Sequence, residues 1–104
     1  MMITEDEANL LSRFFYIFSD PTRLKIISAL LTAEKGSRCV NKVSEYLSLS
    51  QPVVSQQLRI LKDAGLVTVT RDRQFYRYAV ADKHVAEILQ TGLDHIYGKT
   101  KHEE

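Results

Sequence analysis

The chain has little that could serve as a covalent scaffold or a flexible linker. It contains one cysteine in 104 residues, which excludes an internal disulfide and the class of disulfide-stapled secreted domains. Four glycines and two prolines, with no low-complexity tract or repeat, leave no linker between domains. No apolar run approaches the roughly 20 residues of a membrane-spanning helix, and the N-terminus is acidic before it is apolar, unlike a signal peptide. We expect one cytoplasmic domain over residues 1–104, with its core at about 8–98.

A strong excess of charge is also missing. Fourteen lysines and arginines against thirteen aspartates and glutamates give a net charge of +1, which by itself does not indicate a nucleic-acid binder. The distribution of the charges is more informative, because residues 51–78 carry five basic side chains and two acidic ones, a local excess of three. A basic stretch inside a near-neutral chain predicts one basic face.

Hydrophobic periodicity predicts four helices in the first two thirds of the chain. Asp20-Pro21 is typical of a helix start, because an N-cap side chain precedes proline at the first helical position. That helix is expected to stop at Lys35-Gly36, and Ser50 is expected to cap the fourth helix. The first helix is apolar around much of its circumference, so a partner surface must cover it. The expected helices span residues 6–19, 21–33, 39–49 and 51–64.

The periodicity then changes, and two β-rich runs flank a polar tip predicted at residues 71–74, which indicates a hairpin. A last helix begins near Asp82, and residues 99–104 are expected to fray. Four helices, a basic-tipped hairpin and a final helix, with a tight serine-containing turn before the fourth helix, predict a mainly α winged helix-turn-helix fold. The apolar positions expected to face inward on the last helix are Val85, Ile88, Leu89, Leu93 and Ile96.

Residues 49–67, LSQPVVSQQLRILKDAGLV, carry the strongest functional signal. On a helix that begins at Gln51, short hydroxyl and amide groups project away from the apolar face and can reach base edges in the major groove of DNA. Lys62 and the hairpin tip are better placed for the phosphate backbone. Any one of these residues alone would indicate a solvated surface, but together with the turn and the hairpin they favour DNA binding. The predicted DNA-binding residues are Gln51, Ser55, Gln56, Arg59, Lys62, Arg71, Arg73 and Gln74.

Three segments in this order, DPTRLKIISALL, LSLSQPVVSQQLRILKDAGLV and FYRYAV, resemble the ArsR/SmtB family of bacterial metal-responsive repressors. The resemblance covers roughly residues 8–98. It implies a homodimer, formed through the first and last helices, that binds an inverted-repeat operator in double-stranded DNA. An inducer then releases the dimer. Dimerisation agrees with the two apolar helices, which carry more apolar surface than a chain of this size can cover alone.

The resemblance also implies where a metal binds. The thiol site of the family uses two cysteines one residue apart, and Cys39 has no such neighbour, so we expect it to be a small buried hydrophobe. The zinc site of the family, on the last helix, runs Asp-x-His, then His eleven residues later, then His or Glu three further on. Asp82, His84 and His95 match three of these four positions, and Gly98 stands at the fourth.

This spacing implies a metal site shared between two subunits. Eleven residues are about 16.5 Å of helix rise, far beyond the reach of one zinc ion with bonds near 2.1 Å. Two last helices that cross antiparallel would bring His84 of one chain to His95 of the other. Water, His102 or, more weakly, Glu103 would complete the ligands. Zinc (Zn²⁺) is the expected metal and nickel or cobalt (Ni²⁺, Co²⁺) the alternative, while a degenerate site without metal stays open.

Two other classes of function compete with this interpretation. A winged-helix module that docks a protein partner is the alternative, and it would show neither a two-fold operator nor strongly salt-dependent DNA affinity. An enzyme is not expected. No hydroxyl or thiol nucleophile lies in a recognisable motif, and the chain has no phosphate-binding glycine loop.

Overall fold

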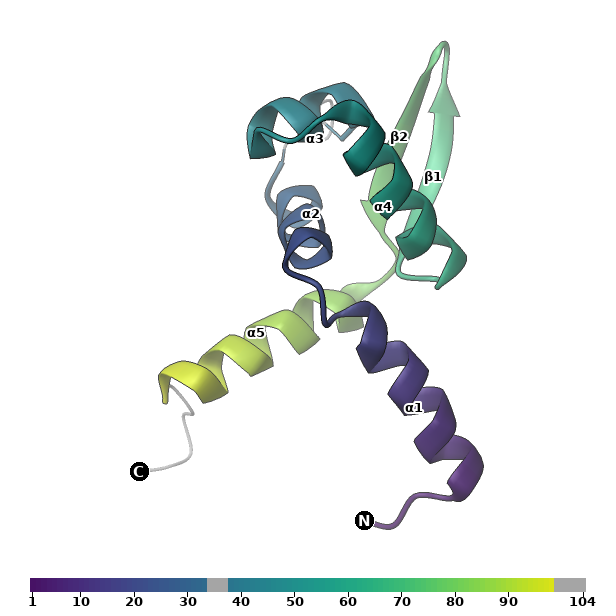
Figure 1. Cartoon of the computed structure of the whole chain (residues 1–104), viewed down its shortest axis with the longest axis vertical. Coiled ribbons are helices and arrows are strands. Elements are labelled where there is room, and N and C mark those ends of the chain that lie inside the picture. Colours follow the sequence, from purple (N-terminus) through teal and green to yellow (C-terminus); the bar gives the residue numbers. More distant parts are fainter. Residues whose placement is uncertain (34–37, 99–104) are drawn as a thin grey trace.

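The computed structural model describes residues 1–33 and 38–98, and these form five helices and one antiparallel hairpin (Figure 1). The predicted order of four helices, hairpin and last helix is confirmed. The predicted helix stop at Lys35-Gly36 and the tail at 99–104 lie outside the described residues. The elements are α1 (Glu5–Ile17), α2 (Pro21–Thr32), α3 (Val40–Leu47), α4 (Gln51–Asp63), β1 (Val67–Asp72), β2 (Phe75–Val80) and α5 (Lys83–Tyr97).

Side-chain caps fix where the helices begin. Asp20, Ser50 and Asp82 each accept a hydrogen bond from a backbone N–H in the first turn of α2, α4 and α5, at 3.0, 3.3 and 2.9 Å. Thr4 and Glu7 form a capping box, which begins α1 one residue before the predicted start. The predicted bounds of these helices are therefore confirmed to within two residues.

The hydrophobic core lies where α2, α3 and α4 meet the base of the hairpin. The apolar face predicted for α4 is confirmed, since Val54, Leu58 and Leu61 are fully buried. Ser48 ends α3 in the left-handed conformation, at φ 57°, so the chain turns sharply into α4. The buried cluster consists of Ile26, Ile27, Ala29, Leu30, Val43, Val54, Leu58, Leu61, Leu66, Val67 and Val85.

The hairpin corrects one prediction. The two strands pair from Val67 with Val80 to Asp72 with Phe75, so the turn has two residues and not the four predicted at 71–74. Arg71 and Asp72 belong to β1. The tighter turn is possible because Arg73 adopts φ 62°, and hairpins with two-residue turns need such left-handed backbone.

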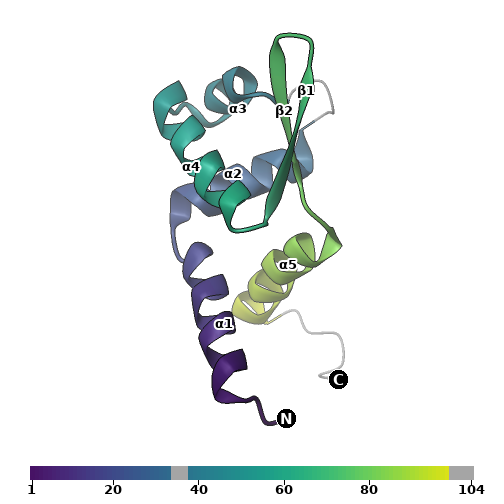
Figure 2. The same ribbon diagram turned by 90° about the vertical axis from the view of Figure 1, so that its right-hand side faces the viewer.

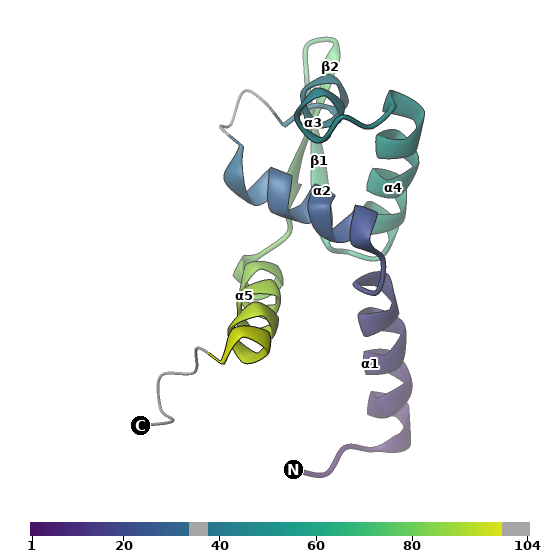
Figure 3. The ribbon, with the colours of Figure 1, turned by 60° about the vertical axis from the view of Figure 1, so that its left-hand side comes forward.

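Helices α1 and α5 extend away from the core, toward the end of the molecule opposite the hairpin tip (Figures 1, 2 and 3). No residue of α1 is buried, and on α5 only Val85 is. The expectation that Leu93 and Ile96 face inward is wrong for the single chain, where they are 46% and 75% exposed. Periodicity identified the apolar face correctly, but no element within residues 1–33 and 38–98 covers the part of it that carries Leu93 and Ile96.

The dimensions of the molecule agree with these two uncovered helices. Its extents are 47 × 34 × 21 Å, and its radius of gyration is 15.4 Å, whereas about 13 Å is usual for a compact domain of this length. None of the helices in residues 1–33 and 38–98 is long and apolar enough to cross a membrane.

Candidate nucleic-acid interface

The predicted DNA-binding residues are all exposed, and they lie on two neighbouring elements. Helix α4 turns its apolar side toward the core and its polar side outward, because apolar residues recur in it at helical spacing. The N-terminal end of α4 and the hairpin tip lie toward the same end of the molecule (Figure 1). The exposed residues are Gln51, Ser55, Gln56, Arg59 and Lys62 on α4, and Arg71, Arg73 and Gln74 on the hairpin.

A groove of about 570 Å³ separates α4 from the hairpin. Two cationic side chains and three hydroxyl groups line it, and these are the donors that bind phosphate oxygens along a DNA backbone. The acidic side chain of Asp63 also lines the groove. The lining residues are Ser55, Arg59, Lys62 and Asp63 from α4, and Val69, Tyr76 and Tyr78 from the hairpin.

Tyr76 and Tyr78 were not predicted as site residues. They are two positions apart on one strand, so their side chains share a face, which here is the face toward α4. The alternation in FYRYAV carries this signal. Assigning the face, however, requires the register of the strand against its neighbour, which the sequence does not supply.

Contacts within the hairpin hold the side chains of Arg71 and Arg77 in place. The Arg71 Nε donates to the Arg73 carbonyl at 2.9 Å, and its guanidinium lies 5.6 Å from the centroid of the Tyr76 ring. Arg77 forms a 3.1 Å ion pair with Asp72 and is only partly exposed. Because that pair is neutral overall, Arg71 and Arg73 supply the positive charge of the hairpin tip.

The predicted metal-binding residues lie at the two ends of α5. Asp82 Oδ1 is 3.3 Å from His84 Nδ1 and also accepts the His84 backbone N–H at 2.9 Å. His95 lies in the last turn, so the structure brings Asp82 and His84 together but not His95. Among residues 1–33 and 38–98, no three His, Cys, Asp or Glu side chains of one chain are grouped to hold a metal. His102 and Glu103 lie outside these residues.

Two further positions, Gly98 and Cys39, bear on which residues could bind a metal ion. Gly98, which stands where the resemblance expects a fourth ligand, ends α5 at φ 71°, a left-handed C-cap that favours glycine. The helix therefore stops at the residue that would have to carry a ligand. Cys39 is buried, as predicted, and precedes α3 without a side-chain capping bond.

Comparisons with known sequences identify the family. A family model described as "Bacterial regulatory protein, arsR family" matches residues 20–69, from the start of α2 into β1. An uncharacterized HTH-type transcriptional regulator of Methanocaldococcus jannaschii is 40% identical over 79 residues, which are 76% of this chain and 86% of that protein. A probable mercury resistance operon repressor of Streptomyces lividans is 42% identical over 79 residues, 75% of this chain and 60% of that protein.

Solved structures agree with this assignment. The antimony-specific transcriptional repressor AntR superposes with a TM-score of 0.79 at 26% identity, covering 94% of this chain and 86% of that one. A homodimeric winged helix-turn-helix DNA-binding domain from Mycobacterium bovis superposes with a TM-score of 0.75 at 22% identity, covering 98% and 97%. The predicted winged helix-turn-helix fold is thereby confirmed. This chain belongs to the arsR family of bacterial regulatory proteins, whose members are transcriptional regulators and not enzymes.

Proposed function

We propose that this chain is a metal-responsive transcriptional repressor that binds operator DNA as a homodimer. The observation that carries the proposal is the polar, exposed side of α4 beside a groove whose other wall is the hairpin. Two similar proteins support a response to metal or metalloid. One is a probable repressor of a mercury resistance operon, and the other is an antimony-specific repressor.

Each half of the DNA-binding face has its own role in the proposal. The N-terminal half of α4 enters the major groove, where Gln51, Ser55 and Gln56 contact base edges. Arg59 and Lys62 follow one and two turns later and contact the phosphate backbone, as does Arg73 on the hairpin. Base contacts select the sequence, and phosphate contacts supply affinity for DNA of any sequence.

The homodimer is proposed to form through α1 and α5. Leu10 and Phe15 on α1 are 59% and 52% exposed, and Ile96 on α5 is more exposed still. An apolar groove of about 620 Å³ between α5 and the pair α2 and α3 continues this surface. A two-fold dimer places its two α4 helices about 34 Å apart on one side of the duplex, so the operator is an imperfect palindrome.

The proposed inducer site uses Asp82 and His84 of one subunit with His95 of the other. Imidazole nitrogens and a carboxylate oxygen are the donors that zinc accepts, and nickel and cobalt accept them as well. The 3.3 Å approach of Asp82 to His84, with both side chains exposed, fits one half of such a site. A bound metal ion would join the two α5 helices and favour one arrangement of the dimer over the arrangement that fits DNA.

Electrophoretic mobility shift with the DNA upstream of the protein's own gene tests the whole proposal. We expect a shift at low salt that weakens steeply as salt rises, is lost when the palindrome is scrambled, and decreases when zinc is added. A chelator should restore the shift. Equal affinity for the scrambled duplex would overturn specific DNA recognition, and the protein-docking alternative would then be the better account. A shift that zinc leaves unchanged would overturn the proposed inducer.

A further inference from the structure

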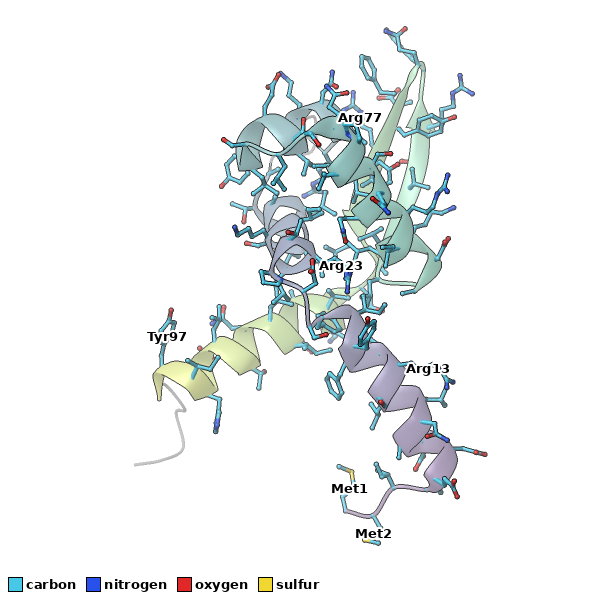
Figure 4. All side chains as sticks on the ribbon, viewed as in Figure 1. Met1, Met2, Arg13, Arg23, Arg77 and Tyr97 are labelled. Atoms are coloured by element: carbon cyan, nitrogen blue, oxygen red, sulfur yellow. The ribbon has the colours of Figure 1, made fainter. Side chains whose placement is uncertain are left out.

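Arg23 joins three helices at one point of the fold. Its Nε donates to the Ile17 carbonyl at the end of α1, at 2.8 Å, and its Nη1 donates to the Gln57 side-chain oxygen on α4, at 3.1 Å. Its own backbone N–H donates to the capping carboxylate of Asp20 at the start of α2, at 3.0 Å. Figure 4 shows Arg23 where α1 and α2 meet, beside α4. All three bonds are partly buried.

The bond to Ile17 secures a helix that has few other attachments. The last carbonyls of a helix have no partner within it, and a cation there is favourable because of the helix dipole. Helix α1 has no basic residue in its own last turn, so the next helix supplies the cation through Arg23. No residue of α1 is buried, and only Phe14 and Ile17 of α1, with the C-cap Phe18, pack against the edge of the core.

The bond to Gln57 acts on the helix proposed to read DNA. Gln57 lies between exposed Gln56 and buried Leu58, at the border between the two sides of α4. Successive residues of a helix are about 100° apart around its axis. The bond to Gln57 therefore adds to the buried side chains of α4 in fixing the rotation of this helix, and with it the direction in which Gln56 projects.

We propose that Arg23 is a positioning residue for DNA recognition, which sets α4 against α1 through its bonds to Gln57 and Ile17. The inference rests on the proposed function, because it assigns α4 to the DNA and α1 to the subunit interface. Arg23 then connects the dimer interface to the base-reading helix inside one subunit, without touching DNA itself. A change in the direction of α1 would reach α4 through two hydrogen bonds to one guanidinium, and such bonds to a charged group are stronger than neutral ones.

A double-mutant cycle on DNA affinity tests this role. The variants are Arg23→Ala, Gln57→Ala and the two together, each titrated against the operator and against an unrelated duplex. We expect each single variant to bind the operator about 10-fold more weakly or worse, which is the scale of one charge-assisted hydrogen bond. Affinity for the unrelated duplex should hardly change. The double variant should bind no worse than the weaker single variant, because both changes remove the same Arg23–Gln57 bond and Arg23→Ala already removes the bond to Ile17.

Two further variants keep the test decisive. The control variant Arg13→Ala also removes an arginine side chain, but from the exposed outer side of α1 (Figure 4). We expect this variant to bind both duplexes like the wild type. Gln57→Met keeps the length of the side chain and the helix but removes the acceptor, so it should lose operator affinity even if Arg23→Ala does not fold.

Distinct outcomes separate the inference from the function on which it rests. Additive losses in the double variant, equal losses on both duplexes, or wild-type binding by Gln57→Met would each overturn the role of Arg23. A wild-type protein that does not distinguish the operator from the unrelated duplex would overturn the proposed function instead.

Discussion

At the scale of single residues, the exposed side of α4 carries groups suited to bases near its start and groups suited to phosphates further along. Gln56 is the clearest of the base-reading candidates, because it is exposed, carries an amide, and lies in the N-terminal half of the helix. Amide side chains can pair with adenine through two hydrogen bonds. Arg59 and Lys62, which lie further along the helix, are better placed for phosphates, whose contacts carry no sequence information.

We therefore expect Gln56→Ala to lower discrimination between operator and mutated operator by roughly 1–3 kcal/mol, the energy of one good base contact. Competition titrations with operators altered one base pair at a time measure this, and the loss should fall at one position in each half-site. Asn41→Ala removes an exposed amide from α3 and should leave discrimination unchanged. Unchanged discrimination in Gln56→Ala would show that α4 is not inserted as proposed.

Arg73 combines a proposed phosphate contact with a left-handed backbone. Both Arg73→Ala and Arg73→Gly should weaken binding to all sequences alike and flatten the slope of log affinity against log salt by about one unit. They should differ in stability, because glycine adopts φ 62° without the steric cost of a side chain, about 1 kcal/mol, and alanine does not. Thermal unfolding should rank glycine above alanine. A salt slope equal to that of the wild type would show that Arg73 does not reach the DNA.

The residues that sequence reasoning missed are those whose role depends on distant partners. Gln57 carries no signal of its own, because its partner Arg23 is 34 positions earlier in the chain. Tyr76 and Tyr78 depend on strand register in the same way. The eight residues proposed to bind DNA could be selected from the sequence because helical spacing and a local excess of charge are properties of contiguous sequence.

At the scale of elements, the helix starts were predictable and two of the turns were not. Asp20 and Ser50 cap α2 and α4, and aspartate and serine are among the residues preferred at the N-cap position of a helix. The left-handed residues Ser48 and Arg73 could not be predicted, since neither is glycine or asparagine, the usual occupants of such backbone. Pairing of Asp72 with Phe75 flanks Arg73, and packing of α3 and α4 in the core flanks Ser48.

Helix α5 also bears the sharpest test of the proposed metal site. His84 and His95 lie near its opposite ends, so a site shared between subunits should survive in a mixed dimer. We expect the His84→Ala homodimer and the His95→Ala homodimer to bind no zinc at this site. A heterodimer with one copy of each should bind one zinc ion, because one His84 and one His95 of different subunits remain.

Equilibrium dialysis of tagged and purified heterodimer against zinc measures this stoichiometry, with the wild-type dimer, expected to bind two ions, as the reference. Asp82→Asn serves as a further comparison, because asparagine also caps helices and the substitution removes only the charge of a proposed ligand. A heterodimer without any zinc would rule out sharing between the subunits and leave the histidines of α5 as surface residues.

At the scale of the whole molecule, the exposed apolar sides of α1 and α5 predict self-association. Sedimentation equilibrium at micromolar concentration should give twice the 11.9 kDa of one chain. Ile96→Asp places a charge in the proposed interface and should shift the mass toward that of the monomer. Phe75→Asp, on an exposed residue of the hairpin at the opposite end, should leave the mass unchanged. A wild-type mass near 12 kDa would contradict the dimer.

The elongated shape also has a consequence for stability, which should depend on the concentration of the protein in the cell. In the proposed dimer, a chain whose radius of gyration is 15.4 Å, with two helices extending from its core, would have part of its stability in a bimolecular equilibrium. Its melting temperature should then rise with protein concentration, by mass action alone. A cell that makes few copies would hold a larger fraction as monomer, which is both less stable and unable to span a two-fold site. Gene dosage, and not only inducer, would therefore set how firmly the operator is occupied.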